Sequence, residues 1–376
     1  MKHSNIIFFC ALVLCLASCS KSQIRMTFDG FTNDTIIVMS VPVDMLSTAT
    51  DDSALMIDTL LIKNNRIEIA ARDEAMAYTF LFKETDDCGH HFSRRSINTM
   101  TMPEDRLTFE VRRTQEQFEY TAKGSDYVEG VADYDSFMRP ISHKIDQIDR
   151  GIEANWGEIR TLYDTRRAKA AEWLERNMNN PAAVYVLAYE VSSTALLNYY
   201  DKLLPMINSS PLKPVVEQGK LNAELAMVTR QAQELIKEGA EAPLFTLADN
   251  HNKEVSLASF RGKWVVLDFW GTWCGYCVKG IPAMKVAYEK HKNKCEFISI
   301  DCNESREKWL EGVEKYQMPW VHLYNSADVA PAKNVSAIYA VQGYPTKIII
   351  TPKGLIHKIF VGENQEFYNE LDNIRK

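Results

Sequence analysis

A short motif, Cys274-Gly-Tyr-Cys277, constrains this chain more than any other feature of its sequence. It follows an apolar run typical of a β-strand, residues 264–270, and opens a stretch of helical character. Two cysteines three residues apart on the first turn of a helix share a face and can bond to each other. The free N–H groups and the positive dipole end of that helix favour a thiolate on the first cysteine. The motif therefore predicts a redox pair, with Cys274 as nucleophile and Cys277 as resolving thiol.

The same spacing can also supply two ligands of a zinc ion. A tetrahedral site would need two more ligands, and the nearest candidates are His291, Cys295 and Cys302. Their spacing alone leaves such a site open, but the candidates are isolated and nothing else in the sequence supports it. The redox interpretation is favoured, and no metal site is predicted.

Several features accompany the motif: Asp268 six residues before Cys274, Pro282 in the following helix, and Gly343-Tyr-Pro-Thr346 ahead of a second β-run. Residues 239–247 read Gly-Ala-Glu-Ala-Pro-Leu-Phe-Thr-Leu, and residues 257–263 read Leu-Ala-Ser-Phe-Arg-Gly-Lys. This combination resembles the thioredoxin superfamily, and more narrowly the TlpA-like and ResA-like thiol-disulfide oxidoreductases of the bacterial envelope. The resemblance covers residues 239–376 and implies an α/β thioredoxin fold there.

The resemblance also implies roles for residues around the cysteines. Pro345 matches a cis-proline that faces the pair, where the backbone meets an incoming peptide strand; an ordinary trans proline at a strand start is the alternative. Trp273, Tyr276 and Tyr344 are the expected substrate-binding residues. Asp268 matches a buried acid beneath the site that could take the proton of the resolving thiol, and a solvated aspartate at the strand edge is the alternative.

The chain departs from the family it resembles at two points. Many TlpA-like members carry a glutamate three residues after the second cysteine, and this chain has Gly280 there. The proton transfer is therefore left to Asp268 or to water. The intervening dipeptide is Gly-Tyr where Gly-Pro or Glu-Pro is usual. Because this dipeptide helps set the thiol pKa and the reduction potential, the direction of electron flow stays open.

The first residues predict export. Lys2 precedes an apolar run, residues 6–16, which is too short to span a bilayer and has the layout of a secretory signal. Leu16-Ala-Ser-Cys19 resembles a bacterial lipobox, which implies a signal peptide at 1–18 and acylation of Cys19; a plain signal peptide is the alternative. Since Ser20 is not the aspartate that retains such proteins at the inner membrane, we expect a periplasm-facing anchor in the outer membrane.

The remaining cysteines and the charge narrow the class of protein. Of eight cysteines, Cys88, Cys295 and Cys302 remain beside the pair once Cys19 and the signal residues are set aside. Cys295 and Cys302 flank a β-run about 23 Å long, beyond disulfide reach. Without residues 1–18 the chain has 42 basic and 50 acidic residues, a net charge of −8. Nothing in this balance predicts nucleic acid as a partner.

The part before residue 239 divides by pattern. Residues 19–123 alternate in the manner of β-strands, with a hairpin predicted about Asn64-Asn65, and resemble the small β-sandwich domain that precedes thioredoxin modules in envelope lipoproteins. The Cys88-Gly-His90-His91 segment could bind metal, but an exposed loop is the simpler interpretation. Residues 124–238 are helical in pattern. An apolar stripe runs over residues 141–163, and Asn180-Pro181 reads as a helix start; the stripe is interpreted as packing, with dimerisation as the alternative.

The sequence thus predicts a β-sandwich-like domain, a helical connector and a C-terminal thioredoxin fold. The predicted function is a lipid-anchored periplasmic thiol-disulfide oxidoreductase that acts on envelope protein disulfides or thiols without a bound cofactor. Its electrons would come from a membrane thiol reductase. One alternative is a peroxiredoxin-like peroxidase, although the proline such a loop needs is replaced by Leu267. Another is a non-catalytic envelope binding lipoprotein.

Overall fold

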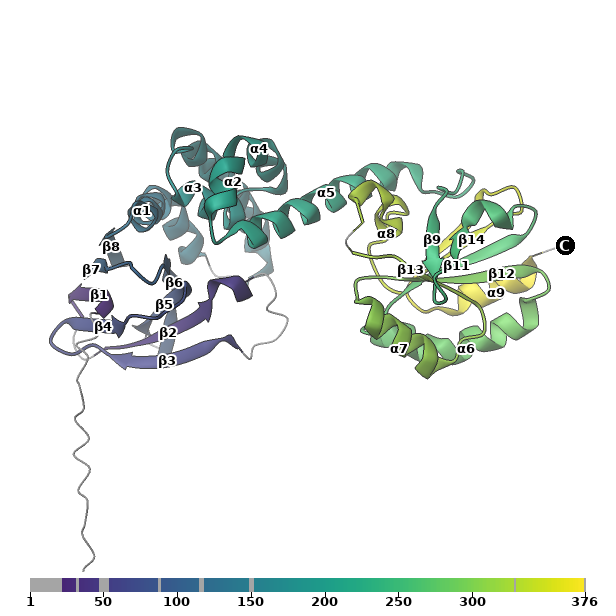
Figure 1. Cartoon of the computed structure of the whole chain (residues 1–376), viewed down its shortest axis with the longest axis horizontal. Coiled ribbons are helices and arrows are strands. Elements are labelled where there is room, and N and C mark those ends of the chain that lie inside the picture. The colour runs from purple at the N-terminus through teal and green to yellow at the C-terminus, as the bar shows by residue number, and fades with distance from the viewer. Residues whose placement is uncertain are drawn as a thin grey trace, which may run out of the picture. The chain divides into compact units, whose positions relative to one another are not determined.

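The computed structural model describes residues 22–31, 34–46, 54–86, 89–114, 118–148, 152–327 and 329–374, without the side chains of 22 and 83–95. The predicted signal peptide, Cys19 and Cys88 lie outside these residues. The chain forms two compact units, Met1–Lys220 and Leu221–Lys376. Figure 1 shows strands and then helices in the first unit, and a mixed α/β arrangement in the second. Within the described residues, no helix is long and apolar enough to cross a membrane.

The described strands of the first unit form two four-stranded sheets, with the orders β4-β1-β7-β8 and β3-β2-β5-β6. Their bounds are β1 Ser22–Asp29, β2 Thr35–Pro42, β3 Met56–Leu61, β4 Arg66–Ala70, β5 Met76–Asp86, β6 Gly89–Thr101, β7 Leu107–Arg113 and β8 Phe118–Lys123. Neighbours are antiparallel except for the parallel pair β1 and β7. Alternate residues face inward, and both sheets contribute to one apolar core. Phe80 and Phe109, from different sheets, have ring centroids 6.3 Å apart.

The predicted hairpin about Asn64 and Asn65 is only partly correct. Both asparagines have positive φ, 52° and 57°, as a two-residue turn requires. The flanking strands are joined only by a bridge between Lys63 and Arg66, because β3 pairs with β2 and β4 pairs with β1. The turn therefore carries the chain from one sheet to the other.

Helices follow the sheets and build a second core. Their bounds are α1 Asp126–Gln147, α2 Trp156–Arg176, α3 Ala182–Tyr189, α4 Ser193–Ser209 and α5 Lys213–Leu235, the last of which contains the division between the units. Tyr134 of α1 and Trp173 of α2 are fully buried and meet edge to face at 5.4 Å. This core also includes Leu187 and Leu203, so the helices pack mainly on one another.

The apolar stripe over residues 141–163 is not one continuous face. Helix α1 ends at Gln147 and α2 begins at Trp156, so the stripe spans two helices. Ile141 and Ile145 are buried, whereas Ile152 and Trp156 are about half exposed, at 50% and 55%. The prediction was wrong here because helical periodicity cannot show where a chain leaves the helix.

The predicted start of α3 at Asn180 is one residue early. The helix begins at Ala182 with Pro181 as its N-cap. The Asn180 side chain still accepts a hydrogen bond from the Ala182 N–H at 2.8 Å, so it satisfies one of the unpaired donors of the first turn.

A seven-stranded sheet in the order β10-β9-β13-β12-β11-β14-β15 forms the centre of the second unit. Strands β11, β12 and β13 are parallel to one another, β14 pairs antiparallel with β11, and β15 pairs antiparallel with β14. The strands are β9 Thr246–Asp249, β10 Glu254–Ser256, β11 Trp264–Trp270, β12 Cys295–Asp301, β13 Val321–Tyr324, β14 Thr346–Ile350 and β15 Ile356–Val361. The helices are α6 Gly275–His291, α7 Arg306–Tyr316, α8 Val335–Ile338 and α9 Gln365–Asn373.

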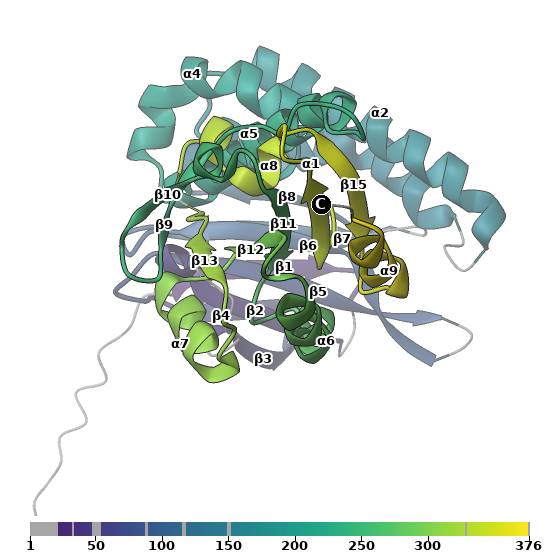
Figure 2. The ribbon, with the colours of Figure 1, turned by 90° about the vertical axis from the view of Figure 1, so that its right-hand side faces the viewer.

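Both faces of this sheet are covered. Val266 and Trp270 of β11 pack under α6, α7 and α9, while Val265, Leu267 and Phe269 pack on the face of α8. Figure 2 looks onto this unit and shows α6, α7 and α9 on one side of the sheet and α8 on the other. Central strands that are buried on both faces read as continuous apolar runs, which is why β11 and β14 were recognisable in the sequence. The predicted fold class is confirmed: a thioredoxin-like α/β domain follows two β-sheets and a helical region.

Candidate redox-active site

Cys274 and Cys277 are joined by a disulfide bond at the start of α6, with their Cα atoms 5.2 Å apart. Cys274 is the N-cap of the helix, and its Sγ accepts a hydrogen bond from the Cys277 N–H at 3.1 Å. A sulfur in this position faces the unpaired N–H groups and the positive end of the helix dipole. Each cysteine is only 6% exposed. A helix N-terminus favours the thiolate form of a cysteine placed at it.

Polar side chains form a row beneath the disulfide, on the sheet face that α6 covers. Asp268 in β11 is paired in register with Ser299 of β12 and with Lys347 of β14. The Ser299 hydroxyl donates to Asp268 Oδ2 at 3.1 Å, and Lys347 Nζ lies 4.0 Å from Oδ1. The Asp268 side chain is 13% exposed, so it is largely buried and not a solvated edge residue.

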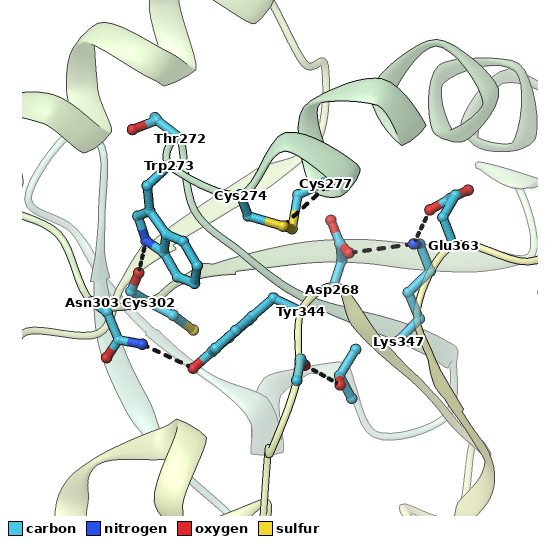
Figure 3. The surroundings of a disulfide bond; sticks show 12 residues. Asp268, Thr272, Trp273, Cys274, Cys277, Cys302, Asn303, Tyr344, Lys347 and Glu363 are labelled. Carbon is cyan, nitrogen blue, oxygen red and sulfur yellow. Dashed lines mark hydrogen bonds and ion pairs between the residues drawn. A yellow bond between two sulfur atoms is a disulfide. The ribbon is translucent and has the colours of Figure 1, made fainter. Parts of the chain in front are cut away.

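Burial dominates the acidity of Asp268. Loss of hydration raises the pKa of this carboxyl, whereas the Lys347 ammonium and the Ser299 hydrogen bond lower it, and Glu363 raises it. The net pKa lies above the ordinary value, which suits a group that must accept a proton and then release it. Figure 3 shows the Asp268 carboxylate between the disulfide and the Lys347 ammonium.

Lys347 has a second, closer partner. Its Nζ lies 2.6 Å from Oε2 of Glu363, which stands between β15 and α9. The Lys347 side chain is only 4% exposed and that of Glu363 23%. The Tyr368 hydroxyl of α9 donates to the other oxygen of Glu363.

The loop before the cysteines is held on two sides. Trp273 Nε1 donates to the Cys302 carbonyl at 2.8 Å, and the Trp273 ring meets that of Tyr344 edge to face at 5.2 Å. Asn303 Nδ2 donates to the Tyr344 hydroxyl at 3.2 Å. Figure 3 shows these contacts beside the disulfide. They join the active-site loop to the end of β12 and to the loop before β14.

The Tyr344–Pro345 peptide bond is cis, as the resemblance predicts. The Pro345 carbonyl accepts from the Gly362 N–H at 2.8 Å, and the Thr346 hydroxyl donates to the Gly343 carbonyl at 2.7 Å. These bonds hold the loop against β15.

Two of the three predicted substrate-binding residues present aromatic surface to solvent. Trp273 is 51% exposed and Tyr276 is 71% exposed, on either side of Cys274 in sequence. Tyr344 is instead partly buried and lies against Trp273. Exposed aromatic rings at a reactive site are suited to binding another protein.

The alternative zinc ligands are not brought to the cysteine pair. His291 bonds to Asp372 of α9 at 3.0 Å. Cys295 is the first residue of β12 and Cys302 directly follows its last, and both are buried free thiols. Burial raises the pKa of Cys295 to about 11 and of Cys302 to about 12, so both stay protonated at neutral pH. Within the part of the chain that the structure describes, no group of three or more potential ligands could hold a metal ion.

Lys347, Glu363 and Ser299 are residues of this site that the sequence analysis missed. Lys347 has a signal in the sequence, because it is a charged residue within the apolar run of β14 and needs a buried partner. Glu363 has no such signal, because glutamates are common in surface loops and the sequence does not show that this one has a buried partner.

Comparison with known proteins adds relatives for the second unit. The profile of the AhpC/TSA family matches residues 239–359. The chain is 33% identical over 136 residues to the thiol-disulfide oxidoreductase ResA of Bacillus subtilis, a match that covers 36% of this chain and 73% of ResA. It is 32% identical over 142 residues to the thioredoxin-like protein YneN of the same organism, covering 36% and 80%. The thioredoxin domain of a Bacteroides vulgatus thiol-disulfide oxidoreductase is 27% identical, with a TM-score of 0.34, and the match covers 36% of this chain and 96% of that one.

Proposed function

Because this chain belongs, through its C-terminal domain, to the ResA family of thiol-disulfide oxidoreductases, we propose that it exchanges disulfides with proteins of the cell envelope. The observation that carries this proposal is the Cys274–Cys277 disulfide at the start of α6, flanked by the exposed rings of Trp273 and Tyr276. A redox pair set in an aromatic surface can meet a disulfide on another protein.

The reductive cycle has two steps. The Cys274 thiolate attacks one sulfur of a substrate disulfide, forming a mixed disulfide and releasing the other substrate sulfur as a thiolate. Cys277 then gives its proton to Asp268 and attacks Cys274 Sγ, so that the Cys274–Cys277 bond forms and the second substrate sulfur leaves as a thiolate. Two electrons pass from the protein to the substrate, and the departing thiolates take up protons. The reverse sequence oxidises a substrate dithiol, and the potential of the pair decides the direction.

The proposed location is the periplasmic side of the outer membrane. Leu16-Ala-Ser-Cys19 supports cleavage after residue 18 and acylation of Cys19. Several acyl chains on one cysteine exceed the two membrane signals that stable anchoring needs. A membrane thiol reductase is the proposed electron donor, and the helical region of the first unit is the proposed surface for any homodimer.

Disulfide exchange is favoured over the two alternatives. A thiol peroxidase needs a proline at position 267, where this chain has a fully buried leucine in β11. A non-catalytic binding lipoprotein would not require the row of Ser299, Asp268 and Lys347 beneath the cysteines, because buried charges are costly in an apolar sheet.

The test is a trapping experiment. In Cys277→Ala the mixed disulfide cannot be resolved, so envelope proteins should accumulate in covalent complexes through Cys274. Cys274→Ala is the matched control and should trap nothing. Non-reducing electrophoresis of envelope extracts, with mass spectrometry of the bands, measures both. Complexes with Cys274→Ala in place of Cys277→Ala would reverse the assignment, and their absence from both would refute the proposal.

A further inference from the structure

Gly280 in α6 lies directly beside the carboxylate of Glu363. A Cβ atom at Gly280 would lie 2.5 Å from Oε2 of Glu363 and 2.7 Å from its Cδ, closer than such atoms approach. The carboxylate of Glu363 therefore occupies the space beside α6 that a side chain at position 280 would fill. Glycine at this position of the helix makes room for a carboxylate from the loop after β15.

That carboxylate controls where the Lys347 ammonium lies. Lys347 Nζ is 2.6 Å from Glu363 and 4.0 Å from Asp268, so it is bonded to the first and only near the second. A lysine this deeply buried pairs with whichever carboxylate is available. Without Glu363, the ammonium would be drawn to Asp268 and would hold that carboxylate in a tight ion pair.

We propose that Glu363, acting through Lys347, is a positioning residue that keeps Asp268 free to accept the proton of Cys277. This inference rests on the proposed disulfide exchange and deepens it. Glu363 and Lys347 do not touch the reacting sulfurs. They set how readily Asp268 takes the proton, and so they act on the second step of the cycle and not on the attack by Cys274.

The groups that face Asp268 come from every element around it. Ser299 faces it from β12, Lys347 from β14, Glu363 from the loop after β15 and Tyr368 from α9, and the thiol of Cys302 after β12 also interacts with it. Figure 3 shows Cys277 of α6 on the other side of the carboxylate from Lys347. Only Lys347 and Glu363 carry charge among these, and their effects on the Asp268 pKa are opposite: lysine lowers it and glutamate raises it. Removing each in turn should therefore shift the pH dependence in opposite directions.

The experiment follows both steps in the reduced full-length protein by stopped flow with dithionitrobenzoate. The first equivalent of nitrothiobenzoate reports attack by Cys274, and the second reports displacement by Cys277. Signal from the Cys274→Ala/Cys277→Ala double variant is subtracted as background. Glu363→Gln keeps the shape of the side chain and removes its charge. Glu370→Gln is the matched control, because Glu370 is similarly exposed, at 22%, and is paired with His357 and Lys358.

Glu363→Gln should slow the second phase about tenfold at neutral pH, which is part of the roughly 100-fold that a general base contributes. The acid limb of the pH–rate profile of the second phase should move to lower pH. Lys347→Met should move that limb to higher pH. Glu370→Gln should match the wild type, and the first phase should stay unchanged in all three variants. In a Glu363→Ala background, Gly280→Glu has room for its side chain and should restore much of the second phase.

Three results would overturn the inference. If the second phase of Glu363→Gln had the same rate as that of Glu370→Gln across pH, Glu363 would have no role in the second step. Shifts of the acid limb in the same direction for Glu363→Gln and Lys347→Met would indicate a structural effect alone, and thermal unfolding of each variant identifies a loss of fold. If the wild type releases no second equivalent, disulfide exchange itself fails and this inference fails with it.

Discussion

At the scale of residues, a few polar groups in an apolar layer determine what the site can do. Ser299, Asp268 and Lys347 occupy neighbouring register positions on three strands, on a face otherwise built from residues such as Val266 and Phe297. Each is paired, so the row is tolerated. Because water is largely excluded, the pKa of Asp268 depends on its neighbours in this row.

Asp268→Asn keeps the shape of the side chain but removes the proton acceptor, so it should slow the second phase by about 100-fold or more and leave the first phase unchanged. The raised pKa of Asp268 also has a consequence for stability. A carboxyl group whose pKa is higher in the folded than in the unfolded state adds to the free energy of unfolding at pH values below its unfolded-state pKa. This contribution is lost as the pH rises through the folded-state pKa. Asp268→Asn should therefore be more stable than the wild type at pH values above the folded-state pKa of Asp268, and its stability should not fall as the pH rises through that pKa. Thermal unfolding of both proteins across pH measures this. A wild-type second phase in this variant would assign the proton transfer to water.

At the scale of elements, the first turn of α6 combines reactivity with recognition. Its N-terminus faces Cys274, and the same turn presents Tyr276 to solvent. The preceding loop is fixed by Trp273, which bonds to the Cys302 carbonyl and packs on Tyr344. The sulfur is thus held still while the surface around it can meet a partner.

Tyr276→Ala should slow the reduction of a protein disulfide such as insulin by about tenfold, since an aromatic side chain that a partner protein covers typically contributes about 1–2 kcal/mol to binding. The reaction with dithionitrobenzoate should change little, because a small disulfide needs no docking surface. Val286→Ala is the control, because Val286 lies farther along the same helix and is equally exposed, at 70%. Equal losses on both substrates would show that Tyr276 acts on the cysteines and not on docking.

At the scale of the whole molecule, the two units have separate cores. The sheets and helices of the first unit pack around two apolar clusters, and the seven-stranded sheet of the second unit has a cluster on each face. Among the described residues, the redox pair and the groups that tune it all lie in the second unit. The disulfide chemistry is therefore expected to be independent of the proposed lipid anchor.

Cys19→Ala should move the protein from the membrane fraction to the soluble periplasmic fraction, because it removes the residue that we propose to be acylated. Its disulfide exchange in solution should equal that of the wild type. Fractionation with mass spectrometry of the N-terminal peptide measures both. Unchanged membrane association, together with no acyl mass on the wild type, would refute the lipid anchor.

Local patterns were enough to predict the redox pair, the thioredoxin-like domain and the order of β, helical and α/β regions. The reason is that a CxxC at the start of a helix, and strands buried on both faces, leave their mark within a few consecutive residues. The same local information placed the turn at Asn64-Asn65 but could not show that its strands enter different sheets.

The tertiary structure decided how the site is tuned. Gly280 and Glu363 are 83 positions apart in the sequence, and only the packing of α6 against the loop after β15 puts the carboxylate where the missing side chain would be. Lys347 is likewise an unexplained charge in an apolar strand until the register sets it beside Asp268. Charge–charge effects act through distances in space, so the sequence names the reactive sulfurs while the fold determines which groups control their protons.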